Sequence, residues 1–389
     1  MIRSWTDYLD GMQDSGGYSK IATREEKART LQAHGSIGGV ILAGVHQWGG
    51  SLLDQTLPRP LLPIANRPLV TYSLDWLQRS GIADICICGN SATPLLRERL
   101  EREPIPDVRL HHYEDTMPRG PAGCIRDAWS GGGFETLVVV DGTILPQTDI
   151  SEVIEAHART SAIMTVVVEA RHGPGGSIND ALTPTGIYVF DRRALDCVPT
   201  TGYQDVKEGL IPRLYEQGDH ITTYVSRKPA PRVTETESYL AVNDWTAERM
   251  ISRPGASDGY ARIGDALVHS SVPISPDVKL IGPVLVGLGT KLGEGVTLVG
   301  PTTVGTDCVL GDGAVVCRSS IWDSCSVGSG VFLDRCVLTH EAVVGPKSTV
   351  RCTVWSQTRR RSSLVVSFGS LLGPGRKRKR IPGPSRRVA

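Results

Sequence analysis

A few residues of this chain have types and positions that could do chemistry. Asp141 ends an apolar, strand-like run from Leu137, where its carboxylate could bind a metal ion or simply cap a turn. Arg59, between two prolines, could neutralise a phosphate or pair with a surface carboxylate. His340, in the repetitive C-terminal half, is either a general base or a lone exposed histidine. The chemistry to look for is therefore anion binding, metal binding and proton transfer.

Two other groups of residues are weaker candidates for metal sites. His111 and His112 are adjacent, so on a strand their side chains would point to opposite faces. None of the nine cysteines forms a Cys-x-x-Cys pair, which favours buried thiols over disulfides or a zinc site.

The elements that must position these residues belong to an ordinary globular protein by composition. The chain has 389 residues, 40% hydrophobic and 21% charged, which is enough for two or three domains. Its first residues lack the layout of a secretory signal, and its apolar runs are far shorter than the roughly 20 residues of a membrane span. We therefore expect a cytoplasmic protein.

The net charge of +1 hides an asymmetry along the chain. Residues 359–389 hold ten Lys or Arg and no Asp or Glu, so the remainder carries 32 basic against 41 acidic residues. A tail with this charge and no apolar periodicity is expected to be disordered, and to bind an acidic partner or a membrane surface.

The first half of the chain alternates strand-like and helix-like segments. Short apolar runs predict strands, and stretches with helical spacing lie between them; this pattern is typical of an α/β domain with a largely parallel sheet. The predicted strands are 40–42, 82–88, 137–140, 164–168 and 187–190, and the predicted helices 69–77, 122–129, 150–158, 206–215 and 238–250. We assign 1–34 to an extension of unknown role and 35–255 to this domain.

Residues 256–355 carry a six-residue repeat. Small or β-branched residues follow the repeated aliphatic residue by four positions up to Ser320, and glycine often follows it directly, as at Gly287 and Gly305. The aliphatic positions are Ile274, Leu280, Val286, Leu292, Leu298, Val304, Leu310 and Val316, then, with one-residue slips, Ile321, Val327 and Leu333, and Leu338, Val344 and Val350. This pattern predicts a left-handed parallel β-helix, with the aliphatic residue inside and the glycine at a corner that needs a positive φ. Residues 356–389 form the basic tail.

The segment from Leu42 to Leu69, LAGVHQWGGSLLDQTLPRPLLPIANRPL, resembles the opening of the sugar-1-phosphate nucleotidyltransferases. Further similarity lies at Gly120–Gly123, Val138–Leu145 and Thr185–Phe190, so the resemblance spans about residues 38–250. A following β-helix is common in that family. The resemblance implies a Rossmann-like nucleotidyltransferase domain and, as nucleotide-binding residues, Leu42, Ala43, Gly44, Arg59, Gly123 and Asp141.

The similarity fails at the positions that the family uses for catalysis. The loop glycines fall on Val45 and Gln47, and the loop Thr and Arg on Trp48 and Gly49. The first metal-binding Asp falls on Thr143, and the second, counted back from Tyr239-Leu240, on Arg232. No Glu-Lys-Pro segment that would hold the sugar phosphate lies between Val168 and Gly186. Since each lost contact of this kind costs about 10²- to 10³-fold, most of the family's rate acceleration should be lost.

Three hypotheses follow for the function. The first is a non-catalytic or regulatory homologue that binds a nucleotide, a nucleotide sugar or an active homologue. The second is an active enzyme with a rebuilt site, in which Arg59 and Asp141 act with Mg²⁺ held near Asp141; Mg²⁺ is expected only in this case. The third is a hexapeptide acyltransferase that uses His340. We also expect a homo-oligomer, or pairing with an active homologue, through the β-helix.

Overall fold

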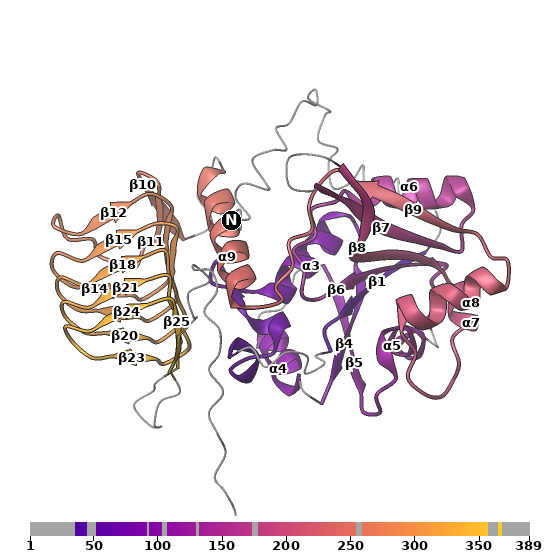
Figure 1. Cartoon of the computed structure of the whole chain (residues 1–389), viewed down its shortest axis with the longest axis horizontal. Helices are drawn as coiled ribbons and strands as arrows, with labels where there is room; N and C mark the ends of the chain where they lie inside the picture. Colours follow the sequence, from indigo (N-terminus) through magenta and orange to yellow (C-terminus); the bar gives the residue numbers. More distant parts are fainter. Residues whose placement is uncertain are drawn as a thin grey trace, which may run out of the picture.

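The computed structural model describes residues 36–44, 52–91, 93–102, 107–129, 132–172, 178–253, 259–356 and 365–367. An α/β domain and a stack of short parallel strands lie side by side, with one long helix, α9 (Thr236–Ser252), between them (Figure 1). The predicted fold class, an α/β nucleotidyltransferase-like domain followed by a β-helix, is confirmed. Within the described residues, no helix is both long and apolar enough to cross a membrane.

The α/β domain is built on a seven-stranded mixed sheet with the order β5-β4-β1-β6-β8-β7-β9. Its strands are β1 (Ile37–Leu42), β4 (Asp84–Asn90), β5 (Arg109–Asp115), β6 (Thr136–Asp141), β7 (Met164–His172), β8 (Ile178–Asp191) and β9 (Ile221–Ser226). The first four strands in this order are mutually parallel, and β9 is parallel to β7. The strand β8 is antiparallel to both β6 and β7, because β7 and β8 pair as a long hairpin rather than through a helical crossover.

Helices cover both faces of this sheet, as expected when the strands are apolar throughout. Val40 and Val139 face a core shared with α5, whereas Ile41 and Val138 face a core shared with α3 and α6. The helices are α3 (Leu69–Arg79), α4 (Pro94–Arg102), α5 (Gly120–Ala128), α6 (Ile150–Thr160), α7 (Arg193–Asp196) and α8 (Ile211–Glu216), with a π-helical turn η3 (Val206–Leu210) before α8. The sequence interpretation missed α4 and β9, whose apolar patterns are interrupted by charged or polar residues.

The C-terminal domain is a three-sided coil of short strands. One side is the sheet β10 (Tyr260–Ile263), β11 (Ala266–His269), β13 (Val284–Val286), β16 (Thr302–Val304), β19 (Ser320–Ile321), β22 (Val337–Leu338), β25 (Thr353–Trp355) and β26 (Val365–Ser367). The second is β12 (Lys279–Ile281), β15 (Thr297–Val299), β18 (Val315–Cys317), β21 (Phe332–Asp334) and β24 (Thr349–Arg351). The third is β14 (Lys291–Leu292), β17 (Val309–Leu310), β20 (Ser326–Val327) and β23 (Val343–Val344). All the predicted aliphatic positions lie in or against one continuous core, so the repeat assignment is confirmed.

The slips in the repeat are real changes in coil length. One coil takes 18 residues from Val286 to Val304, but 17 from Val304 to Ile321. The shorter coil moves the small interior position to Ser319, which is fully buried. Ser320, which the sequence pattern placed inside, instead lies 2.9 Å from the hydroxyl of Tyr239 on the neighbouring domain.

The reason for glycine in the repeat also differs from the prediction. Gly287 and Gly305 do not have positive φ; left-handed φ occurs two residues later, as at Gly289 and Asp307. A Cβ atom on Gly287 would lie 2.6 Å from the carbonyl oxygen of Gly305 in the next coil. Glycine is therefore required there because successive coils stack closely, not because of the turn.

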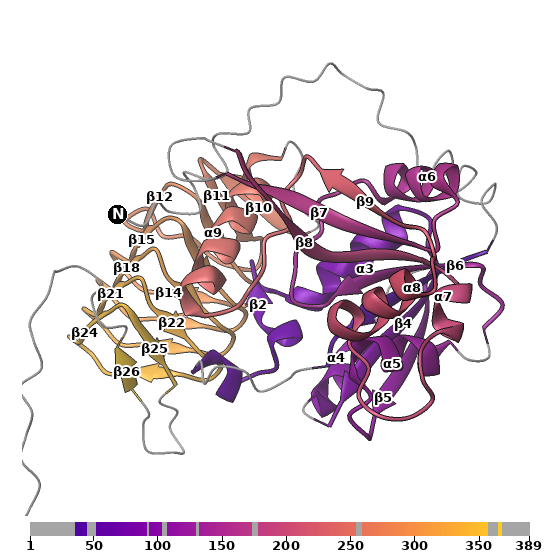
Figure 2. The same ribbon diagram turned by 45° about the vertical axis from the view of Figure 1, so that its right-hand side comes forward.

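The two domains share a core. Trp322, Val337 and Val354 of the β-helix pack with Leu62 and Tyr239 of the α/β domain. Two 3₁₀ turns and a small hairpin that lead into α3 also take part in this contact. They are η1 (Leu53–Gln55), η2 (Arg59–Leu61) and the hairpin strands β2 (Pro63–Ile64) and β3 (Arg67–Pro68). Figure 2 shows β2 beside the β-helix. The domains therefore form one packed unit rather than two loosely linked bodies.

The end of the β-helix corrects one prediction about the tail. Residues 365–367, inside the segment predicted to be disordered, form β26, which pairs antiparallel with β25. An edge strand leaves backbone groups unpaired, and β26 covers the edge of the last coil on this side. The other basic-tail residues from 357 onward, like the extension 1–34, lie outside the described residues.

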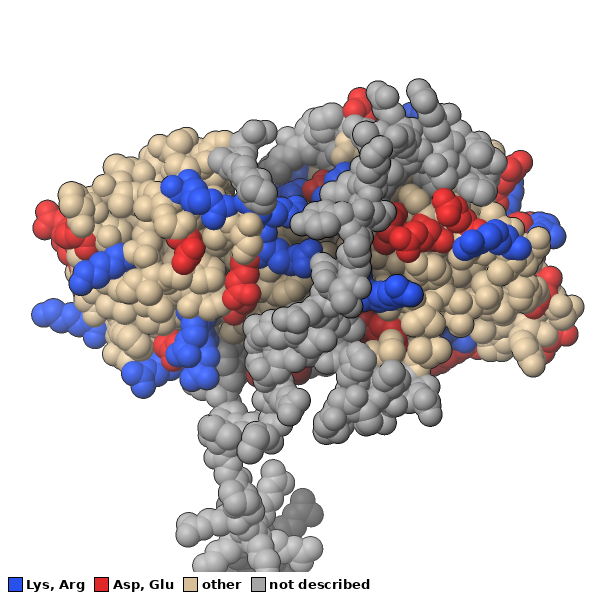
Figure 3. Space-filling view, turned by 90° about the horizontal axis from the view of Figure 1, so that it is seen from above, with Lys and Arg blue, Asp and Glu red and all other residues tan. Residues whose placement is uncertain are grey.

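The surface of the molecule carries both charges. In the view from above, Lys and Arg alternate with Asp and Glu, and most of the visible β-helix surface is neutral (Figure 3).

Candidate functional site

The candidate site lies where the parallel strands β1, β4, β5 and β6 reach their carboxyl ends. Ligands of α/β proteins bind at this edge, because the connecting loops and helix N-termini gather there. Leu42 pairs in register with Cys88 on one side and Asp141 on the other. Ala43 is fully buried, and its N–H donates to the carbonyl of Cys88 at 2.8 Å. The structure thus brings Leu42, Ala43, Gly44 and Asp141 together.

Asp141 ends β6 and organises a tight turn. Its Oδ1 accepts hydrogen bonds from the N–H of Thr143 at 2.9 Å and from the hydroxyl of Thr143 at 2.7 Å. An extended arrangement of Asp141 and Thr143 would need the strand to continue through Thr143, but β6 ends at Asp141. Of the two predictions for Asp141, the turn cap is confirmed.

Arg232 completes this cluster from a segment 91 residues further along the chain. The main chain around it forms a short bridge: Arg232 pairs with Ile144, and the N–H of Leu145 donates to the carbonyl of Pro231 at 2.8 Å. This brings the Arg232 guanidinium against Oδ2 of Asp141 in an ion pair and within 3.1 Å of Oγ1 of Thr143. Its other terminal nitrogen donates to the carbonyl of Thr185 at 3.0 Å. The two positions at which the family resemblance expected metal ligands, Thr143 and Arg232, are therefore in direct contact.

Glycine at position 186 makes room for this arginine. Gly186 has a φ of +91°, and a Cβ atom there would lie 2.6 Å from Nη2 of Arg232 and 3.0 Å from Cβ of Asp141. The sequence interpretation missed the part played by Thr185 and Gly186. The signal was available, because both lie in the Thr185–Phe190 stretch that resembles the family.

The electrostatics of this cluster are those of a satisfied ion pair. Burial by itself would raise the pKa of Asp141, but the charge and hydrogen bond of Arg232, helped by Thr143, hold the pKa below its ordinary value. Asp141 is therefore ionised at neutral pH, and both of its oxygens are engaged. The side chains of Asp141 and Arg232 remain 31% and 32% exposed, so the pair still faces solvent.

The residues present do not fit a magnesium ion. Mg²⁺ needs an octahedral shell of oxygen ligands, and here the carboxylate, hydroxyl and carbonyl oxygens all accept from one guanidinium. A fixed positive charge at the centre of the cluster also repels a divalent cation. Among the described residues, no three His, Cys, Asp or Glu side chains are grouped to hold a metal.

The other predicted site residues are not part of the contacts around Asp141 and Arg232. Arg59 begins η2 and is partly buried. Gly123 lies in α5, where a Cβ atom would be 2.9 Å from Cβ of Arg119, so close packing explains the glycine. Val45, Gln47, Trp48 and Gly49 lie outside the described residues.

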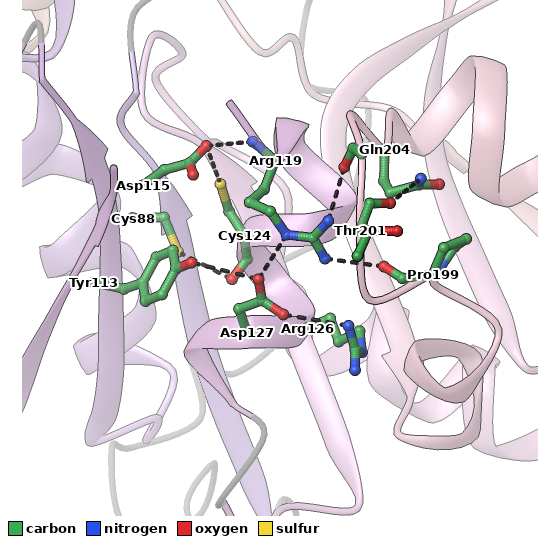
Figure 4. A network of polar contacts seen from close by, with 11 residues as sticks. Cys88, Tyr113, Asp115, Arg119, Cys124, Arg126, Asp127, Pro199, Thr201 and Gln204 are labelled. Atoms are coloured by element: carbon green, nitrogen blue, oxygen red, sulfur yellow. Dashed lines mark hydrogen bonds and ion pairs between the residues drawn. The ribbon is translucent and has the colours of Figure 1, made fainter. Parts of the chain in front are cut away.

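Arg119 fixes the N-terminal end of α5 (Figure 4). This side chain is only 6% exposed; its Nε bonds Asp127 at 2.8 Å, and its terminal nitrogens donate to the carbonyls of Gly202 and Pro199 at 2.8 and 2.9 Å. The carbonyl of Gln204 accepts from the N–H of Ala122 at 2.9 Å. The first turn of α5 is thus tied to the segment before η3, which fixes one wall of the site.

His340 differs from the lone exposed histidine that the sequence favoured. Its Nδ1 lies 3.8 Å from Oδ2 of Asp323, and its ring lies 5.1 Å from that of Trp322. Burial lowers the pKa of His340 in spite of the Asp323 charge. Both residues line a pocket of about 340 Å³ between α4 and the β-helix, away from the Arg232 cluster.

Comparison with known proteins agrees with this fold. Residues 51–176 match the nucleotidyl transferase family model. By fold and by sequence, the chain is a relative of the sugar-1-phosphate nucleotidyltransferases, which confirms the resemblance.

The similar proteins point mainly to one branch of this family. The mannose-1-phosphate guanylyltransferase of Mycobacterium tuberculosis is 25% identical over 269 residues, covering 63% of this chain and 74% of that protein. The mannose-1-phosphate guanyltransferase of Kluyveromyces lactis is 23% identical over 209 residues, 51% of this chain and 57% of that protein. The epsilon subunit of translation initiation factor eIF2B of Schizosaccharomyces pombe is 23% identical over 184 residues, 45% of this chain and 26% of that protein.

Proposed function

We propose that this protein binds a nucleotide sugar without transferring a nucleotidyl group, and that it acts as a regulatory homologue of an active nucleotidyltransferase. The observation that carries the proposal is the Arg232 guanidinium, which takes up the oxygens of Asp141, Thr143 and Thr185. The names of the similar proteins make GDP-mannose the first ligand to test.

A fixed guanidinium supports binding better than catalysis. Arg232 is partly exposed, and because its charge is paired with that of Asp141, the cluster is neutral without Mg²⁺. Nucleotidyl transfer needs more, because charge builds up on the departing pyrophosphate and must be stabilised in the transition state. With Asp141 already committed to Arg232, the rebuilt active site of the second hypothesis lacks a metal ligand.

The segment before β8 supports the same reading. The family resemblance would place a sugar-phosphate-binding Glu-Lys-Pro motif between Val168 and Gly186. In this stretch β7 and β8 pair as a hairpin up to His172 and Ile178. A role other than nucleotide-sugar synthesis is also consistent with the proposal, because one similar protein is named as a subunit of a translation initiation factor rather than as a nucleotidyltransferase.

The test is binding of GDP-mannose and other NDP-sugars by calorimetry and thermal shift, in EDTA and in Mg²⁺, beside an assay for NDP-sugar synthesis. We expect saturable binding with equal affinity in both buffers and no product. Ligand at 100 times its Kd should stabilise the fold by about 2.7 kcal/mol. Magnesium-dependent turnover in the ordinary range of about 1–10³ s⁻¹ would refute the proposal.

A further inference from the structure

The pocket between α4 and the β-helix is lined by residues that the proposed function does not use. Its volume is about 340 Å³, near the lower end of the ~300–1,000 Å³ range of small-molecule sites. The segment before α3 and the helix α4 supply its apolar part, with Leu57, Leu61 and Leu95. Leu95 is 50% exposed, so part of its side chain is still open to contact. This part of the pocket can hold an apolar group by hydrophobic burial.

Charged groups of both signs face this pocket without pairing with one another. Arg99 lies on the wall formed by α4, and Asp323 and Glu341 lie on the wall formed by the β-helix. In the part of the chain that the structure describes, Arg99 forms no ion pair with either carboxylate. Glu98 also lines the pocket, but it has an interaction of its own. Opposite charges that share one pocket and stay apart leave room between them for a ligand that carries both signs.

The two carboxylates belong to adjacent coils of the β-helix. The N–H of Glu341 donates to the carbonyl of Asp323 at 3.0 Å. Oδ1 of Asp323 accepts from the N–H of Thr306 at 2.8 Å, whereas Oδ2 lies 3.8 Å from Nδ1 of His340. Burial lowers the pKa of His340, so the imidazole is neutral at pH 7 and does not compensate the negative charge of this wall. An ammonium group placed beside the two carboxylates would relieve their mutual repulsion.

The charge of Arg99 acts on the same part of the pocket. Burial is the largest cause of the lowered pKa of His340, and the charges of Arg99 and of the two carboxylates also act on this imidazole. The charged side chains therefore gather around His340 rather than at separate ends of the pocket. A ligand that carries an ammonium and a carboxylate on one carbon atom matches this arrangement, and the leucines accept its side chain.

We propose that this pocket binds a free amino acid with an apolar side chain. The ammonium group pairs with Asp323 and Glu341, the carboxylate pairs with Arg99, and the side chain packs on the three leucines of the apolar part. The ligand touches both α4 and the β-helix, so its binding stabilises the junction between the two domains. None of these residues belongs to the Arg232 cluster, so this site is separate from the site of the proposed function.

The test is a titration of the full-length protein followed by saturation-transfer NMR, with L-leucine, L-isoleucine, L-methionine and L-phenylalanine added separately. We expect at least one of them to bind with a Kd below about 1 mM. The amide of that amino acid lacks the negative charge, and its deaminated acid lacks the positive charge. Each analogue should bind about tenfold more weakly, because each loses a hydrogen bond between charged groups. Absence of binding by all four amino acids, or equal affinity for either analogue, would overturn the proposal.

Charge-removing variants assign each contact. Arg99→Gln should weaken binding of the amino acid about fivefold and leave binding of the amide unchanged, because the amide has no carboxylate to pair. Glu341→Gln should weaken both the amino acid and the amide about fivefold and leave the deaminated acid unchanged. Asp323→Asn should have the same effect as Glu341→Gln, and it keeps an oxygen that can accept from the N–H of Thr306.

The matched control is Arg97→Gln. Arg97 lies on the same helix, pairs with Glu101 and is not among the residues that line the pocket, so this variant should leave all affinities unchanged. Melting temperatures equal to that of the wild type would show that the variants fold. Wild-type affinity for the amino acid in Arg99→Gln, or for the amide in both carboxylate variants, would refute the assigned contacts. No nucleotide sugar is used, so failure of this site and failure of the proposed function are distinguishable.

Discussion

The Arg232 cluster makes a gain-of-function prediction. Replacing Thr143 and Arg232 together by Asp should convert the satisfied ion pair into a cluster of three carboxylates, with Asp141 as the third. Three carboxylates without a cation repel one another, so the double variant should be less stable than the wild type in EDTA. A divalent ion relieves that repulsion and should restore stability.

The size of the effect follows from binding linkage. For a dissociation constant on the order of 1 mM, 10 mM Mg²⁺ or Mn²⁺ stabilises the folded state by RT ln 11, about 1.4 kcal/mol. In a protein of this size that raises the Tm by roughly 2 °C. The wild type, whose guanidinium repels the ion, should shift by less than about 1 °C.

The assay is thermal unfolding followed by circular dichroism, in EDTA and in MgCl₂ or MnCl₂, with NaCl added to match ionic strength. Thr143→Asp alone is the control, because Arg232 keeps one positive charge between the two carboxylates, and it should respond less than the double variant. A wild type that gains as much from Mg²⁺ as the double variant would show that Arg232 does not exclude the metal. A well-folded double variant without any response would show that these three positions do not converge as the structure places them.

Three further predictions concern the domain boundary and assembly. Tyr239→Phe should destabilise the fold by about 2–3 kcal/mol in urea unfolding, because the Tyr239 hydroxyl donates to the carbonyl of Pro63 at 2.7 Å and accepts from the buried indole of Trp322 at 2.7 Å. Tyr215→Phe, at a side chain that is 78% exposed, is the control. A loss below about 0.5 kcal/mol for Tyr239→Phe would contradict this prediction. Burial raises the pKa of Asp244 to about 7, so the folded state holds a proton that the unfolded state loses above about pH 4, and stability falls as the pH rises from about 4 to about 7. The Tm of Asp244→Asn should therefore exceed that of the wild type by more at pH 8 than at pH 5. An equal difference in Tm at both pH values would count against this prediction. Self-association through the β-helix remains a prediction: Ile281→Arg, on an exposed strand position, should lower the assembly mass by light scattering, whereas an unchanged mass would place the contact elsewhere.

Some of this site could be predicted from the sequence because its signals are local. The Asp141 turn follows from an acidic residue at the end of an apolar strand, and the position of Arg232 was reached by counting from Tyr239-Leu240. The contact between the two residues could not be derived from composition or periodicity. It depends on a main-chain bridge between Ile144 and Arg232, which forms only when both segments pack beside the sheet.

The sequence by itself determined the α/β and β-helix architecture, because both rest on spacing that repeats along the chain. The six-residue period places an aliphatic residue inside every side of each coil, and stacking the coils buries these residues in one continuous core. Only the tertiary structure decided why Gly287 is a glycine, which residue near Ser320 faces inward, and that His340 has a carboxylate partner. Each of these depends on a neighbour in another coil or another domain, and such neighbours leave no periodic trace in the sequence.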